Sequence, residues 1–462
     1  MKDARHIALF VLLFTWGISA QAQRRVVLDL EGTVQLAVDS SFTAQKLQSD
    51  YNMALHDYLS WQASRKPQLQ LESTSELSLG QRHFYTQGGI NVTQIFEPLG
   101  GSFYGSTLLG YMHTAGETQQ FMTTPVVFGY KQELLFFNPL KWDKRIETLK
   151  LTRAEKELAY GIETVSEEAV GKFFALALAQ DQLQMAEEYL ASCDTIYAIA
   201  ERRYKISSIS KADLSILELE KTNAQMSLAN ARIDQKRAMQ ELVSFLRMGP
   251  DVEIRLIIPD VVQDLQINTV EAIQHARDNN PRYIESQQAI AEALRDAEKA
   301  RIEKTIHLGI DLSVGLNQVA STFQGAYMNL VPQDLAALTF TLPLVDWGKR
   351  RYAYQSALNK VESAQRTEQE MIRDTELDVA LTVADFNERK AIVETARQAF
   401  AIAEDAYTQT MRQFIRAQAS TNSLTWALNC WQTARKNQIA SLKNYWIAYY
   451  HLRRLTLVDY QP

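Results

Sequence analysis

Proline and glycine are nearly missing from two long parts of this 462-residue chain. Residues 140–248 contain no proline and only Gly161 and Gly171, and residues 349–461 contain neither residue type. Because proline is the strongest helix breaker and glycine the next, their absence predicts nearly continuous helices. At 1.5 Å per residue, a helix of roughly 65 residues is about 100 Å long. Few soluble enzymes need helices of this length, whereas a tubular assembly does.

Long apolar runs and catalytic motifs are also lacking. Beyond the N-terminus, no segment approaches the ~20 apolar residues of a membrane helix, so a mature chain that enters a membrane must do so as a β-barrel. We find no nucleophile elbow, zinc-protease motif, paired-cysteine motif or phosphate loop. Adjacent carboxylates such as Glu167 and Glu168 look like solvated helix faces. We therefore expect no enzyme activity, no metal and no cofactor.

The N-terminus has the pattern of a secretory signal. Lys2, Arg5 and His6 precede an apolar segment at residues 7–16, and residues 19–22 offer an A-x-A cleavage site. A membrane anchor is the alternative, but the apolar run is too short to span a bilayer. We expect residues 1–22 to be a signal peptide. The net charge of −6 is evenly mixed along the chain and argues against a nucleic acid partner.

Apolar residues recur every seven positions in both proline-free stretches. The second stretch carries Ile372, Val379, Phe386, Val393, Phe400, Tyr407 and Phe414. The first carries, 210 residues earlier, Ile162, Ala169, Leu176, Leu183, Leu190, Tyr197 and Tyr204. A sustained 3.5-residue repeat is typical of coiled-coil packing. Its recurrence at a fixed offset indicates an internal duplication.

The chain thus divides into two similar structural repeats. The first covers residues 23–252, with a helix at 31–66, a β region at 67–137 and a helical hairpin at 140–248. A linker at 253–267 follows, in which residues 253–258 can form a short strand. The second repeat covers 268–462, with a helix at 268–304, a β region at 306–345 and a hairpin at 347–456. Polar segments at 205–211 and 416–422 interrupt the hairpins, and Ser210 and Ser420 are suited to cap the return helices.

Half of the eighteen glycines lie between Gly80 and Gly129, within the first β region. Glycine turns and alternating polarity predict strands at 69–73, 76–79, 90–96, 102–112 and 125–137. The second β region predicts strands at 307–314 and 338–342, separated by a loop that holds Gly325 and Pro332. Aromatic residues are concentrated in these strands, as in the girdle of an outer-membrane barrel. An ordinary exposed antiparallel sheet is the alternative.

Three motifs resemble the outer-membrane efflux proteins of the TolC type. Residues 272–281 (AIQHARDNNP) resemble the start of a family repeat. Residues 342–350 (LPLVDWGKR) resemble its strand-to-helix junction. Residues 132–142 (QELLFFNPLKW) are similar to that junction in Bacteroidota-like members. The junction residues singled out are Asn138, Trp142, Asp346, Trp347 and Gly348.

The resemblance implies a mainly α fold with a β-barrel part. Duplicated long antiparallel helical hairpins would form a periplasmic α-barrel, and an outer-membrane β-barrel would be completed by trimerisation, with four strands from each chain. The implied function is the outer-membrane channel of a tripartite efflux or type I secretion system, a passive trimeric duct for small molecules or proteins. A trimeric coiled-coil structural or adhesive outer-membrane protein is the alternative.

The implied partners are a homotrimer, a periplasmic membrane-fusion adaptor, an inner-membrane pump of RND or ABC type, and outer membrane lipid. The implied location is the cell outer membrane, with a large periplasmic part. The resemblance places adaptor docking at the periplasmic tips, on Lys205, Ser207, Ser208, Lys211, Arg416 and Ala419. It places the pore mouth at Asp213, Arg412, Asn422 and Thr425.

The sequence departs from the family at several points. Ser41-Phe42 stands where the family has Asn-Pro. Ser207 and Ala417 stand where its hairpin tips have glycine. Asn422 and Thr425 occupy positions that carry an acidic ring in its best-known members, so an acidic gate is not expected. The additional glycine-rich strands of the first repeat exceed the family's four strands.

Overall fold

A computed structural model describes residues 24–78, 83–114, 116, 118–134, 136–207, 209–249, 251–259, 262, 264–305, 307–342, 344–416 and 418–460. The predicted signal peptide and Ser208 lie outside these residues. The chain forms two compact units. Unit 1 contains the described residues up to Ser41 and those of 168–262 and 395–443. Unit 2 contains those of 42–167, 263–394 and 444–462.

The helices come in matched pairs along the chain. Helices α1 (Leu30–Ser40) and α5 (Thr269–Asn279) each have 11 residues, and α2 (Phe42–Ser64) and α6 (Pro281–Glu303) each have 23. Helices α3 (Pro139–Lys205) and α7 (Lys349–Ile415) each have 67 residues. The return helices α4 (Lys211–Phe245) and α8 (Thr421–Thr456) have 35 and 36. Equal lengths in equal order are what a duplicated sequence produces.

The predicted single helices at 31–66 and 268–304 are wrong, because each is broken into two. In the second repeat, Asn280 is extended and caps α6, and Pro281 disfavours helical backbone at the residue before it. The first repeat breaks at Ser41 without a proline. There the Ser40 hydroxyl donates to the Leu246 carbonyl at the end of α4 (2.9 Å), whereas the Asn280 amide donates to Leu455 at the end of α8 (3.2 Å). Both breaks are therefore held by the end of a return helix.

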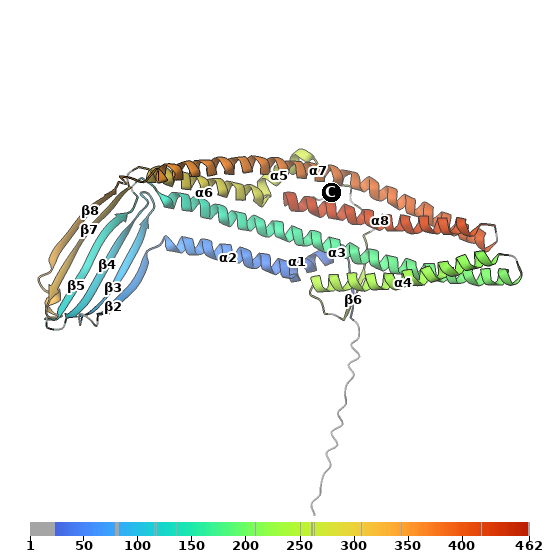
Figure 1. The fold of residues 1–462 in the computed structure, drawn as a ribbon, viewed down its shortest axis with the longest axis horizontal. Helices are drawn as coiled ribbons and strands as arrows, with labels where there is room; N and C mark the ends of the chain where they lie inside the picture. Colours follow the sequence, from blue (N-terminus) through green and yellow to red (C-terminus); the bar gives the residue numbers. More distant parts are fainter. Residues whose placement is uncertain are drawn as a thin grey trace, which may run out of the picture. The chain divides into compact units, whose positions relative to one another are not determined.

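One antiparallel sheet in unit 2 contains six strands, in the order β2-β3-β4-β5-β7-β8 (Figure 1). The strands are β2 (Gln68–Ser78), β3 (His83–Phe96), β4 (Gly101–Thr114), β5 (Gln120–Gln132), β7 (His307–Ala320) and β8 (Val331–Thr341). The helices join the sheet at one end, called here the helix end. The opposite end, where β2, β4 and β7 end and β3, β5 and β8 begin, is called here the loop end.

Most strands are longer than the sequence pattern predicted: those expected at 69–73 and 76–79 form one strand, and those expected at 90–96 and 307–314 extend over 83–96 and 307–320. The strand expected at 125–137 ends at Gln132. The loop expected to hold Pro332 is partly strand, because β8 begins at Val331. Proline is tolerated there because β8 is an edge strand and Pro332 lies near its start. A short parallel pair in unit 1, β1 (Arg24–Leu28) with β6 (Val252–Leu256), includes an N-terminal strand that the sequence did not predict.

The heptad residues of α3 and α7 are buried or half-buried except Tyr204, which is exposed near the end of α3. Val379, Phe386 and Val393 are buried, as are Ala169 and Leu176. In unit 1, Phe400, Ala403 and Tyr407 pack on a core of Met185, Leu428 and Trp431. The rings of Tyr407 and Trp431 stack with centroids 5.4 Å apart. The seven-residue pattern therefore identified the packed face of each long helix.

Glu167 is not on a solvated helix face, as the sequence had suggested. Its carboxylate is mostly buried and pairs with Arg454 of α8 at 3.2 Å. Glu163, one turn earlier on α3, pairs with Arg453 of α8 at 2.8 Å. Glu168 does point outward and pairs with Lys172. Two ion pairs thus fix α8 against α3 inside unit 2, where an unpaired carboxylate would be costly.

Substitution of Phe400 tests the packed face. Phe400→Asp should greatly lower the yield of folded protein, because losing the packed ring costs about 3 kcal/mol and a carboxylate placed there has no partner. Gln398→Asp, two residues away on the exposed side, should change the free energy of unfolding by no more than roughly 0.5 kcal/mol. Size-exclusion yield and thermal unfolding of both variants make the comparison. Equal yields would show that the heptad face was wrongly assigned.

Candidate functional site

The two faces of the six-stranded sheet differ sharply in polarity. The strand register places one set of alternate residues on a common face, which we call the apolar face. Its exposed members include Leu69, Leu71, Leu77, Phe84, Ile90, Val92, Phe103, Leu109, Phe128, Leu312, Val314, Leu338 and Phe340. Among the described strand residues, the acidic side chain on this face is Asp334, near the loop end. Soluble monomers rarely expose so continuous an apolar surface.

Two belts of aromatic rings border the apolar face. Toward the loop end, Phe84, Tyr111 and Phe121 form a chain of contacts with centroids 6.2 and 5.1 Å apart, and Phe323 continues it at 6.0 Å. At the helix end, Phe96, Phe103 and Tyr130 have centroids 5.1 to 6.4 Å apart.

The spacing of the belts fits a lipid bilayer. Phe84 and Phe96 are twelve residues apart on β3, which is about 40 Å of strand at ~3.3 Å per residue. At a strand tilt of about 45°, this corresponds to a height of about 28 Å, close to the ~25 Å apolar band of outer-membrane barrels.

The opposite face of the sheet, which we call the polar face, carries hydrogen-bonded side chains. Asn91 donates to Glu72 at 3.0 Å, and Asn317 donates to Gln333 at 3.0 Å. The Tyr104 hydroxyl donates to Asp311 at 2.8 Å. The Tyr104 ring lies over Gly129, where any Cβ would overlap it. Most carboxylates lie on one face and most exposed leucine and phenylalanine side chains on the other, which is the pattern of a wall between water and lipid.

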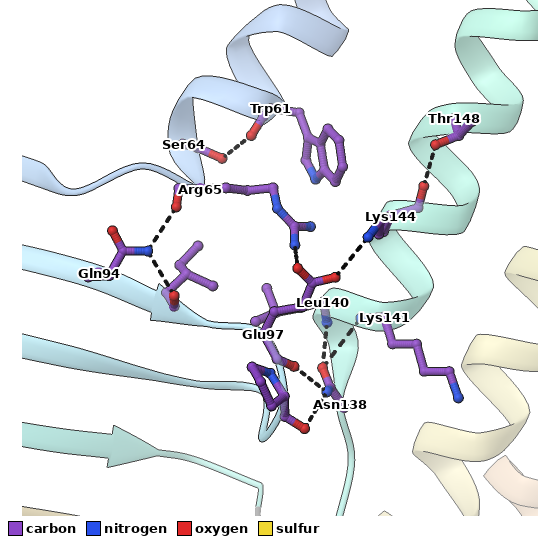
Figure 2. Close-up of polar contacts among 12 residues, drawn as sticks. Trp61, Ser64, Arg65, Gln94, Glu97, Asn138, Leu140, Lys141, Lys144 and Thr148 are labelled. Carbon is purple, nitrogen blue, oxygen red and sulfur yellow. Dashed lines mark hydrogen bonds and ion pairs between the residues drawn. The ribbon is translucent and has the colours of Figure 1, made fainter.

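The junction between the sheet and α3 is built around Glu97 and Asn138 (Figure 2). Glu97, in the β3–β4 turn, pairs with Arg65 at the end of α2 and with Lys144 of α3 at 3.4 Å. Hydrogen bonding from Arg65 holds the pKa of Glu97 below its ordinary value of 4.5. The Asn138 amide donates to the Glu97 carbonyl at 2.7 Å, and its oxygen accepts from the Leu140 backbone at 3.1 Å. One asparagine thus caps α3 and fixes the turn to it.

The sequence pattern indicated Asn138 and Trp142 as junction residues, but it did not indicate Arg65, Glu97 or Lys144. The Trp142 indole donates to Glu298 of α6 at 2.6 Å, which joins α3 to a helix 156 positions away. The available signal for Glu97 was its place in the segment Glu97–Gly101, a turn between two strands. Nothing in the local sequence indicated which cations would meet it.

The second junction repeats this construction with different residues. Asp346 accepts from the Gly348 and Arg350 backbones at 2.9 and 3.3 Å, and these bonds lower its pKa. Gly348 has a φ of +85°, a conformation that favours glycine. The Arg350 guanidinium donates to the Glu303 carbonyl at 2.9 Å, which ties α7 to the end of α6. Trp347 is 92% exposed beside this cap.

The hairpin tips lie in unit 1 and are polar. Ser210 and Asp213 form a reciprocal capping box at the start of α4, so Asp213 serves as a helix cap. At the other tip, the Ser420 hydroxyl accepts from the Ser423 backbone at 3.1 Å. Ser207 has a φ of +55°, the left-handed conformation usual for glycine in this position of a helix end. Ser207 therefore holds a glycine-type backbone conformation at this helix end.

The remaining tip residues have different surroundings. Lys205, Lys211, Arg412, Arg416, Ala419 and Asn422 have exposed or half-exposed side chains. Arg202, Arg203 and Lys205 lie in the last turn of α3, where cations are favoured, and the Arg203 guanidinium lies 5.9 Å from the Phe414 ring. Thr425 instead borders a small cavity within the helix packing of unit 1, beside Tyr189 and Cys193. Asn422 and Thr425 are thus in different environments.

Solved structures of outer-membrane channels share this fold over most of the chain. The Campylobacter jejuni CmeC outer membrane channel has 12% identity, a TM-score of 0.67, and alignment over 92% of this chain and 85% of that one. The outer membrane protein VceC from Vibrio cholerae has 14% identity, a TM-score of 0.66 and coverage of 92% and 95%. The open state of the Neisseria gonorrhoeae MtrE outer membrane channel has 14% identity and a TM-score of 0.57, with alignment over 92% of this chain and 88% of that one.

The chain has the fold of an outer-membrane channel. No family profile and no curated sequence matches it. The expected architecture of long helical hairpins joined to a β part is confirmed.

Within the described residues, every helix is too short or too polar to cross a bilayer.

Asn138→Ala tests the first junction. The change removes the cap of α3 and a donor to the Glu97 carbonyl, which together should cost about 1–2 kcal/mol. The midpoint of thermal unfolding, followed by circular dichroism, should fall. Asn52→Ala on the exposed side of α2 is the matched control and should leave the midpoint nearly unchanged. Similar midpoints for both variants would show that the junction does not depend on Asn138.

Ser207→Gly tests the strained tip. Glycine adopts a positive φ without the Cβ overlap that costs an L-residue about 1 kcal/mol, so the variant should be more stable by about 0.5–1 kcal/mol. Ser215→Gly, the same change inside α4, should destabilise by about 0.5–1 kcal/mol. Chemical unfolding of both variants compares them. A destabilised Ser207→Gly variant would mean that the serine side chain stabilises the tip by more than its backbone strain costs.

Proposed function

We propose that this protein is a TolC-type outer-membrane efflux protein that acts as a passive trimeric duct. It would be the exit channel of a tripartite efflux or type I secretion system and would reside in the outer membrane with a large periplasmic part. No step of covalent chemistry is needed, because a duct works by position and by opening. The partner pump would supply the energy for transport.

The observation that carries this proposal is the sheet. Its apolar face, bordered by two aromatic belts about 28 Å apart, suits a bilayer, and its polar face suits water. Leu344 and Trp347, which are 90% and 92% exposed, follow the helix-end belt. Tryptophan is favoured at the level of the lipid headgroups. The sheet therefore accounts for exposed apolar residues that would be a liability in a soluble protein.

The long helices support the same proposal. A sheet of six strands with two open edges cannot stand alone in lipid, so several copies must complete it. The helical hairpins attached to each copy would then be arranged around the same axis and form the wall of a periplasmic tunnel. We place the periplasmic mouth and adaptor docking at the polar hairpin tips.

The charge of these tips suggests how the mouth treats ions. Residues 201–213 carry four cations and the carboxylates Glu201 and Asp213, and residues 410–425 carry Arg412 and Arg416 with no carboxylate. Lys205 is paired with Glu201 at 3.2 Å, and Asp213 is held in its capping box. A narrow entrance with excess positive charge repels multivalent cations. We propose that this channel lacks a cation-binding gate.

Electrical recording tests both parts of the proposal. Purified protein in planar bilayers should produce discrete current steps. Cobalt hexammine added on the periplasmic side should block them only weakly at micromolar concentration. Asn422→Asp should increase the block, because it adds a carboxylate at a tip, whereas Asn52→Asp on α2 should not.

The outcomes of this recording have separate meanings. An absence of channel currents from correctly folded protein would contradict the duct and favour a structural or adhesive protein. Strong micromolar block of the unaltered protein would agree with a passive duct. It would refute the proposal that excess positive charge at the mouth leaves the channel without a cation-binding gate.

A further inference from the structure

The two edge strands of the sheet are open and have few of the features that shield an edge. β2 and β8 each have 11 residues and one neighbour in the sheet. Natural edge strands are usually shielded by lysine, proline or bulges. β2 contains no lysine, arginine or proline and carries two carboxylates, Glu72 and Glu76, while β8 carries Asp334 and has Pro332 only near its start. The irregular pairings lie inside the sheet, between β4 and β5 and between β5 and β7. Both edges are therefore suited to pair with another strand.

The direction of the strands allows this pairing between copies. All five pairings from β2 to β8 are antiparallel, so β2 and β8 run in opposite directions. When copies related by rotation stand side by side, β8 of one meets β2 of the next as an antiparallel pair. A contact between two different surfaces of identical copies closes into a ring when the rotation between neighbouring copies is a whole fraction of a turn.

The two faces of the sheet also continue across such a contact. Leu69 and Leu71 of β2 lie on the apolar face, as do Leu338 and Phe340 of β8. All four are strongly exposed within one copy. Edge pairing leaves them on the lipid side, next to residues of the same kind, while it satisfies backbone groups that have no partner in lipid.

We propose that the partner of each edge is a second copy of this chain, and that three copies close an eighteen-stranded barrel. Three six-stranded sheets give eighteen strands, whereas the family resemblance implied four strands from each chain and twelve in total. This inference rests on the proposed function for the number of copies and the membrane. The number of strands per copy comes from the sheet itself.

The additional strands widen the outer part of the channel. Barrel diameter grows roughly linearly with strand number, so eighteen strands give a barrel about half again as wide as twelve. Barrels of 16–18 strands leave an aqueous channel. The polar face, with Asn91, Tyr104 and Asn317, would line it. The β part therefore does not limit passage, and large hydrated solutes that pass the helix tips leave freely.

Cysteine cross-linking in outer-membrane fractions tests the arrangement. In a background of Cys193→Ala and Cys430→Ala, Ser73→Cys or Ser75→Cys on β2 is combined with Asp334→Cys or Ala336→Cys on β8. These four positions share the apolar face and cover two registers. After oxidation, at least one pair should give a denaturing-gel ladder that ends at three copies.

Thr107→Cys on β4, combined with the same β8 cysteines, is the matched control. Thr107 lies on the apolar face inside the sheet, two strands from β2, and should form no intermolecular disulfide. If β2 and β3 remained outside the barrel, β4 would become the edge. Cross-links through Thr107 would then replace those through β2 and would overturn the eighteen-stranded barrel. A ladder that ends at another number, or no cross-links from either set, would also overturn it.

Cross-linking and conductance together distinguish a failure of the barrel proposal from a failure of the proposed function. If the protein conducts in bilayers but cross-links only through Thr107, the proposed function is supported and the eighteen-stranded barrel is refuted. If the protein cross-links through β2 and β8 but never conducts, the edge pairing is supported and the duct is refuted.

Discussion

Backbone hydrogen bonds at the two edges of the sheet are the constraint on which the rest of this structure depends. Each edge strand has backbone N–H and C=O groups with no partner in one copy. In water such an edge invites aggregation, and in lipid each unpaired group costs several kcal/mol. The apolar face adds a second demand, because its exposed leucine and phenylalanine side chains need lipid around them. Both demands are met when several copies share one barrel.

The junctions transfer this arrangement from the sheet to the helices. Asn138 and Asp346 each cap a 67-residue helix within a few residues of a strand. Through Glu97, the first junction also binds the end of α2, and through Arg350, the second binds the end of α6. Because a helix is stiff, fixing its first turn sets its direction over many turns. The caps therefore do more for the fold than their individual free energies suggest.

Much of the fold could be predicted from local signals. The long helices followed from missing proline and glycine. Their packed faces followed from the heptad, which is confirmed by the packing of Phe400 and Tyr407 on the core around Trp431. The break at Ser41 could not be predicted, because neither serine nor phenylalanine stops a helix strongly. It depends on the nearby Ser40–Leu246 contact, between residues 206 positions apart. The strand boundary at Val331 was missed because proline usually ends a strand, and an edge position removes that objection.

For the candidate site, residue types could be selected but not their surroundings. Ser210 was expected to cap α4 and does so, whereas the role of Asp213 in the same capping box was not expected. Thr425 was grouped with Asn422 by position, but it borders a cavity inside unit 1. Glu167 looked solvated because its immediate neighbours are polar, yet Arg454 meets it from another helix. Burial and pairing depend on elements far away in the chain.

The sequence by itself determined the length of the hairpin helices, their packed faces, the duplication and the presence of strands rich in aromatic residues. Those properties depend on composition and on periods of a few residues, and local backbone preferences follow directly from both. Only the tertiary structure decided that six strands join in one sheet, that Phe84 and Phe96 belong to separate belts, and that β2 and β8 are left at the edges. Strand pairing depends on contacts between distant residues, and register, not composition, places each side chain on one face or the other.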